Sequence, residues 1–171
     1  MWIAVVDLPT PNGPFSQSTF RIPATDRRYA RTMDFSSVNY VAVVVATLVG
    51  FMVNFAWFGP LKMYIRWNKA LGRTEPPTPE EMPGMPFLFG MTLLGLFVES
   101  TVLAALMGGL WESATVAQGV GLGLAAGVGI ASTTALGHRL FSAQGMKVWA
   151  IEVGADIVVA AVIGAVLAAI G

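Results

Sequence analysis

Three acidic residues lie inside long apolar stretches of the sequence, where carboxyl groups are rare. Glu99 stands near the middle of the apolar run 87–110, and Glu152 and Asp156 stand in another run near the end of the chain. A charged side chain deep in a bilayer costs about 2.5–3.5 kcal/mol on insertion scales, so it usually faces other helices or water and often marks a pathway for ions or protons. Desolvation also favours the protonated carboxyl, which suits a proton carrier at Glu99.

Glu152 and Asp156 are four residues apart, so they share one face of a helix. Like charges at this spacing repel. One of the two carboxyls is therefore expected to be protonated, to pair with Arg139 or Lys147, or to contact water. The predicted polar intramembrane site consists of Glu99, Glu152, Asp156 and Asn54.

A structural role for the same residues is equally open. A protonated Glu99 can join two helices by a hydrogen bond without moving any solute. Glu152 and His138 can lie at the membrane surface and simply be solvated. The residues alone therefore leave transport and a structural role as two alternatives.

Several kinds of site are excluded or disfavoured by the composition. The chain has no Cys and one His, which excludes disulfides and thiolate metal sites and leaves little for zinc or triad chemistry. No phosphate-binding loop, nucleophile elbow or zinc-protease motif is present, so we expect no catalytic residue, metal or cofactor. Lys+Arg and Asp+Glu are equal at 10 each, so nucleic acid is a poor candidate partner. An enzyme is the least favoured class of function.

The apolar residues are gathered into four long runs. Hydrophobic residues make up 55% of the chain and charged residues only 12%. About 20 residues of helix cross the ~30 Å hydrocarbon core of a bilayer, and a helix satisfies its own backbone there. The sequence predicts an all-α integral membrane bundle, in contact with the lipid bilayer, with spans at about 39–58, 87–110, 115–136 and 148–170.

A basic segment follows the first span. Lys62, Arg66 and Lys69 recur at helical spacing, and several prolines follow from residue 76 onward. Residues 62–73 are predicted to form a short amphipathic helix at the membrane interface, on the cytoplasmic side because basic loops stay there. Four tryptophans near predicted span ends are expected to act as interfacial anchors: Trp57, Trp67, Trp111 and Trp149.

Small residues recur every fourth position in the third and fourth spans. Such residues let helix backbones approach closely, so the third span is expected to pack on the fourth. The residues expected in this contact are Gly119, Gly123, Gly127 and Gly164. A second strip on the third span is left for another protomer, which makes a homodimer a candidate assembly; it contains Gly121, Ala125, Gly129 and Thr133.

The first 32 residues contain no span and no convincing signal peptide. We interpret residues 1–32 as a disordered tail, or as upstream of a true start at Met33, and residues 33–171 as the membrane domain.

Several short motifs in this order resemble a family of small bacterial four-span proteins catalogued as domain of unknown function 1761. The resemblance covers Met33 to Gly171 and rests on Asn39-Tyr40, Trp57-Phe58-Gly59-Pro60-Leu61, Thr133-Thr134, Leu140-Phe141, Lys147, Ile151 and Gly154. The chain departs from the family pattern by lacking Phe-Gly-Lys after Pro60-Leu61 and by having Asp156 where an apolar residue is usual. The resemblance implies a four-helix fold in the bacterial inner membrane and implies no activity.

The residues therefore favour two classes of function. Glu99, Glu152 and Asp156 favour transport of protons, cations or a small solute. The small size of the chain and its glycine strips favour a non-enzymatic structural or assembly protein. No residue pattern names a substrate or ligand.

Overall fold

A computed structural model describes residues 33–75 and 77–171, and all regular structure in these ranges is helical. Four helical spans are long and apolar enough to cross a membrane: α1 (Tyr40–Phe58), α3 (Met85–Leu110), the composite span Val116–Phe141 and α6 (Gly145–Ile170). A short helix, α2 (Met63–Ala70), follows α1, and two short turns are η2 (Phe35–Ser37) and η3 (Pro79–Glu81). The predicted all-α bundle of four spans with a short helix after the first is confirmed. The prediction for residues 1–32 lies outside the described residues.

Local sequence signals explain where the spans begin. The Asn39 side-chain oxygen accepts hydrogen bonds from the N–H groups of Val41 and Ala42, at 3.1 and 3.2 Å, and so caps α1. Pro86 lies in the first turn of α3, where a missing N–H costs nothing. Thr115 and Gln118 form a reciprocal capping box at the start of the third span.

The third span is longer than its apolar run and is not a uniform α-helix. It consists of α4 (Val116–Ala126), a π-helical turn η4 (Gly127–Ala131) and α5 (Ser132–Phe141). The helix continues past the predicted span boundary at about 136, because no proline stops it and basic side chains are favourable in its last turn. Arg139, which follows the predicted span, therefore lies in α5.

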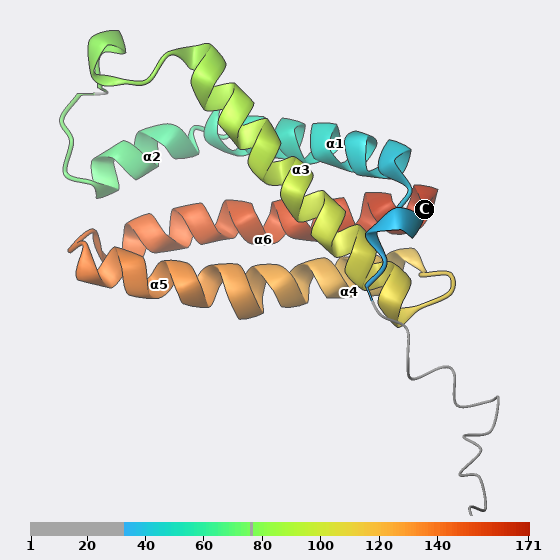
Figure 1. Cartoon of the computed structure of the whole chain (residues 1–171). Helices are drawn as coiled ribbons and strands as arrows, with labels where there is room; N and C mark the ends of the chain where they lie inside the picture. The colour runs from blue at the N-terminus through green and yellow to red at the C-terminus, as the bar shows by residue number, and fades with distance from the viewer. Residues whose placement is uncertain (1–32, 76) are drawn as a thin grey trace, which may run out of the picture. The chain divides into compact units, whose positions relative to one another are not determined.

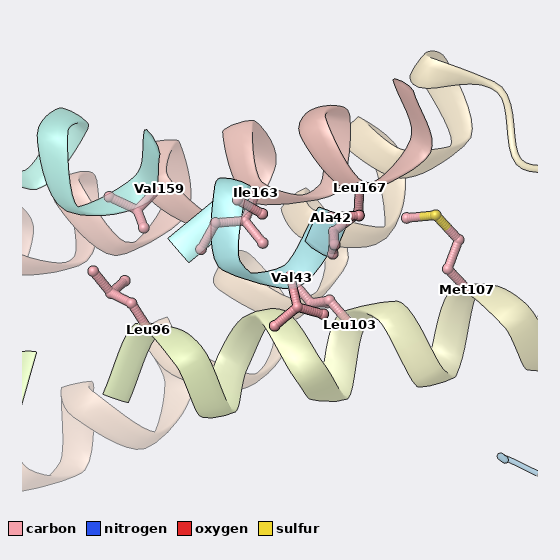
Figure 2. Close-up of a cluster of buried hydrophobic side chains, with 9 residues drawn as sticks. Ala42, Val43, Leu96, Leu103, Met107, Val159, Ile163 and Leu167 are labelled. Carbon is pink, nitrogen blue, oxygen red and sulfur yellow. The ribbon is translucent and has the colours of Figure 1, made fainter. Parts of the chain in front are cut away.

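Helix α6 is the centre of the bundle. Figure 1 shows α1, α6 and the composite span running side by side, with α3 crossing them obliquely. Buried side chains of α1, α3 and α6 form one core, shown in Figure 2, in which Val43 and Ile163 are fully buried. Because lipid tails are as apolar as these side chains, close packing rather than exclusion of water holds this core together.

The backbones of α4 and α6 touch through their glycines. A Cβ atom added at Gly123 would collide with the carbonyl oxygen of Ala160, and one added at Gly119 would collide with that of Gly164. At Gly127 an added Cβ would lie 2.9 Å from the Cα atom of Ile157. No side chain larger than hydrogen fits between the helices at these positions.

Candidate functional site

Trp57, in the last turn of α1, sets the register between α1 and α6. Its indole N–H donates to the carbonyl oxygen of Ile151 at 3.2 Å, and its ring lies 3.0 Å from where a Cβ of Gly154 would be. Glu152 therefore lies level with the end of α1, and the first turns of α6 continue past that end. Asp156 is one helical turn, about 6 Å, further into the bundle.

Both carboxylate oxygens of Glu152 are hydrogen-bonded. The indole N–H of Trp67 in α2 donates to Oε1 at 2.8 Å, and Nε of Arg139 in α5 donates to Oε2 at 2.6 Å. The side chains of Arg139 and Glu152 are 34% and 17% exposed, so the ion pair is largely shielded from solvent. Arg139 and Lys147 were the two candidate partners for the acidic residues of α6, and Arg139 pairs with Glu152. We call Glu152, Trp67 and Arg139 the Glu152 clamp.

Aromatic and polar contacts within and after α2 hold Trp67 in place. Its ring stacks on Tyr64 with 6.1 Å between ring centroids, and the guanidinium of Arg73 lies 5.7 Å from the Trp67 ring centroid. Arg73 also donates to the side-chain oxygen of Asn68 at 3.2 Å, and the amide group of Asn68 donates to the carbonyl oxygen of Tyr64 at 2.9 Å. The clamp therefore joins an ordered α2 to the ends of α5 and α6.

Asp156 and Glu99 continue the line of carboxyls away from the clamp. Asp156 is exposed on α6 and lies within electrostatic reach of Glu152 and Arg139. Glu99, half-buried on α3, lies within electrostatic reach of Asp156. Neither Glu99 nor Asp156 has a hydrogen-bond partner among the described residues. Three carboxyls thus form a series from the end of α1 to the middle of α3.

A buried hydroxyl pair lies beside Glu99. The hydroxyl of Thr47 in α1 is 3.4 Å from that of Ser100 in α3, and it donates to the carbonyl oxygen of Val43 at 2.8 Å. Ser100 is fully buried and Thr47 is 5% exposed, so this contact holds α3 against α1 next to Glu99. Sequence reasoning missed Thr47, since a threonine that bonds its own helix is common in apolar runs.

Among residues 33–75 and 77–171, no hydrogen bond joins Asn54 to the acidic series. It is partly buried on α1, and within the described ranges its amide has no hydrogen-bond partner. A cavity of about 230 Å³ lies at the other end of the bundle, between the start of α1 and the ends of α3 and α6. None of the four predicted site residues lines this cavity. In the part of the chain that the structure describes, no group of three His, Cys, Asp or Glu side chains could hold a metal ion.

Three of the four predicted anchor tryptophans bond to neighbouring helices. Besides Trp57 and Trp67, the indole N–H of Trp149 donates to the carbonyl oxygen of Ser132 at 2.9 Å. These rings therefore form hydrogen bonds between helices. Their positions in the sequence predicted interfacial anchors but did not indicate these bonds.

Comparison with known proteins gives a family match. A family model described as "Protein of unknown function (DUF1761)" matches residues 41–168, from the first turn of α1 to the last turns of α6. No curated protein and no solved structure matches significantly. The matched range contains the four spans almost completely, together with α2.

Proposed function

We propose that this chain, which belongs to the DUF1761 family, conducts protons or small cations across the membrane along Glu99, Asp156 and Glu152. The supporting observation is the series itself: three carboxyls on two helices, each within electrostatic reach of the next. We place the protein in the inner membrane of a bacterium, as the family resemblance implies.

The cost of placing these carboxyls supports a pathway. Asp156 is exposed at membrane depth, and neither it nor Glu99 is hydrogen-bonded to a described residue. In hydrocarbon each such group costs about 2.5–3.5 kcal/mol unless water, a proton or a cation reaches it. Chains of acidic residues that meet water at intervals are the usual means of relaying protons through membrane proteins.

Arg139 fixes the end of the carboxyl series in space. Its ion pair with Glu152, with 2.6 Å between Nε and Oε2, holds the carboxylate where the series meets the end of α1.

Proton flux into liposomes tests the proposal. Purified protein is reconstituted into liposomes that contain a pH-sensitive dye, and a potassium diffusion potential drives proton entry. The wild-type protein should acidify the lumen faster than protein-free liposomes do. Glu99→Gln keeps the size of the side chain but cannot release a proton, so it should lower the rate to that of protein-free liposomes.

Glu80→Gln is the matched control, because Glu80 is exposed in the segment between α2 and α3, outside the spans. It should conduct at the wild-type rate. A flux of sodium or potassium without acidification, abolished by Glu99→Gln, would assign the pathway to cations. A folded Glu99→Gln protein that conducts both protons and cations at the wild-type rate would refute the pathway.

A structural or assembly role is the second candidate, supported by one observation. The second small-residue strip of the third span is exposed, and a Cβ atom added at Gly121 or Gly129 would meet nothing within 4 Å. A second copy packing there would form a homodimer by close backbone approach. Gly129→Leu should then reduce cross-linked dimer in the membrane while leaving the monomer folded, and an unchanged dimer yield would exclude this face.

A further inference from the structure

We propose that the basic face of α2 binds the headgroups of anionic phospholipids. This face consists of Lys62, Arg66 and Lys69, all exposed. The inference does not depend on the proposed ion pathway, since it concerns the outside of α2 rather than the carboxyl series.

The charge of α2 and its flanks has one sign. Between Gly59 and Thr74 every charged side chain is basic. Arg73 is engaged with Trp67 and Asn68, on the docked side of α2. Within residues 33–75 and 77–171 none of the three basic-face residues pairs with a carboxylate. Their charges therefore remain available for an anionic partner.

The docked side of α2 faces away from these charges. Successive residues of a helix are rotated by about 100°, which puts Arg66 and Lys69 roughly opposite Tyr64 and Asn68. Asn68 is 5% exposed, and Trp67 beside it is bonded to Glu152. The basic face consequently points away from the bundle.

Exposed apolar side chains border the basic face. Leu61 is 56% exposed and Ile65 is 63% exposed, and Ile65 lies one residue before Arg66. An apolar border beside basic side chains is the arrangement by which interfacial helices rest on the boundary between headgroups and acyl chains. The boundary of an anionic bilayer matches both features at once, because its headgroups meet the charges and its acyl chains meet the apolar side chains.

The register of the spans puts α2 at headgroup depth. Helix α6 has 26 residues and is about 39 Å long, against a hydrocarbon core of ~30 Å. Trp57, at the end of α1, is level with Ile151, so the first turns of α6 extend past the core. Because α2 follows α1 and is clamped at Glu152, it lies beside this extension. An anionic leaflet attracts each Lys or Arg held at that depth.

Lipid binding to the purified full chain tests the inference. The dissociation constants of phosphatidylglycerol and phosphatidylcholine with matched acyl chains are measured by native mass spectrometry. Wild-type protein should bind phosphatidylglycerol at least about tenfold more tightly, since each basic residue contributes several-fold. Arg66→Gln combined with Lys69→Gln should bring the two constants to within about twofold of each other.

Lys147→Gln is the matched single control for Lys69→Gln, because Lys147 is also exposed but lies on α6. It should weaken the preference for phosphatidylglycerol less than Lys69→Gln does, because Lys147 lies at the same depth but has no basic neighbour on its own helix. Near-UV circular dichroism of the tryptophans should show that α2 stays docked in both variants. Equal affinities for the two lipids in the wild type, an unchanged preference in the double variant, or displacement of the lipid by millimolar inorganic phosphate would each overturn the inference.

Discussion

Glu152 shows how a carboxylate at the membrane boundary is kept in one position. Its two oxygens accept from different helices, Oε1 from Trp67 and Oε2 from Arg139. A partly desolvated charged group needs such partners, because the free-energy cost of leaving it unpaired is larger than the net free energy gained from the pairing. The same residue could therefore end an ion pathway and dock α2, and each role is testable separately.

At the residue scale we predict that Trp67 stabilises the fold through Glu152. Trp67→Phe keeps most of the ring packing and removes the indole donor, so it should lower the free energy of unfolding in detergent by about 1 kcal/mol. In a Glu152→Ala background the same change should have almost no effect, because the acceptor is already absent. A double-mutant cycle measured by denaturant unfolding gives this coupling.

The cycle also has an internal comparison. Trp149→Phe removes a similar indole hydrogen bond, to Ser132, at a site without Glu152. Its effect should be the same in the wild-type and Glu152→Ala backgrounds. If Trp67→Phe also lowered the stability equally in the two backgrounds, the hydrogen bond to Glu152 would contribute nothing and α2 would be docked by packing alone.

At the element scale, the third span depends on small residues for two different tasks. Gly119, Gly123 and Gly127 allow contact with α6, as the added-Cβ geometry shows. At the π turn η4, small hydroxyl side chains bond back to the helix: Ser132 donates to the carbonyl oxygen of Val128 and Thr133 to that of Gly129. This turn has no sequence signal comparable to a proline, so it was not predicted.

We predict a sharp contrast between two neighbouring glycines of α4. Gly123→Ala must push α4 and α6 apart, because the new methyl group would overlap the backbone at Ala160, and it should destabilise the protein by roughly 1–3 kcal/mol. Gly121→Ala meets nothing within 4 Å and improves helix propensity, so it should be neutral or stabilising by up to about 1 kcal/mol. Thermal unfolding of the two variants in the same detergent compares them directly. Equal stability would mean that the two helices are not in backbone contact.

At the scale of the whole molecule, charge asymmetry predicts the orientation in the membrane. Lys62, Arg66, Lys69 and Arg73 lie at the α2 end together with Arg139 and Lys147, whereas residues 111–114, which join α3 to α4, carry no Lys or Arg. Basic loops are retained in the cytoplasm. A reporter fused at residue 113 of a chain that starts at Met33 should therefore give an external signal, and one fused at residue 74 a cytoplasmic signal. The opposite pattern would refute this orientation.

Much of the architecture follows from the sequence itself. Apolar runs of about 20 residues can satisfy their backbone in lipid only as helices, so the four spans were predictable. The helical spacing of Lys62, Arg66 and Lys69 predicted the short helix α2. Helix ends were less predictable: the third span was predicted to end at about 136, whereas its last helix continues to Phe141, because backbone hydrogen bonding continues beyond the hydrophobic segment.

The contacts between helices were decided only by the tertiary structure. Sequence spacing placed Glu152 and Asp156 on one face of a helix, but the pairing of Glu152 with Trp67 and Arg139 depends on how α2, α5 and α6 are arranged. Glu99 and Asp156 are far apart in sequence and come within electrostatic reach because α3 crosses α6. Residue spacing constrains neighbours on one helix, whereas partners on different helices depend on the rotation and tilt that packing imposes on each helix.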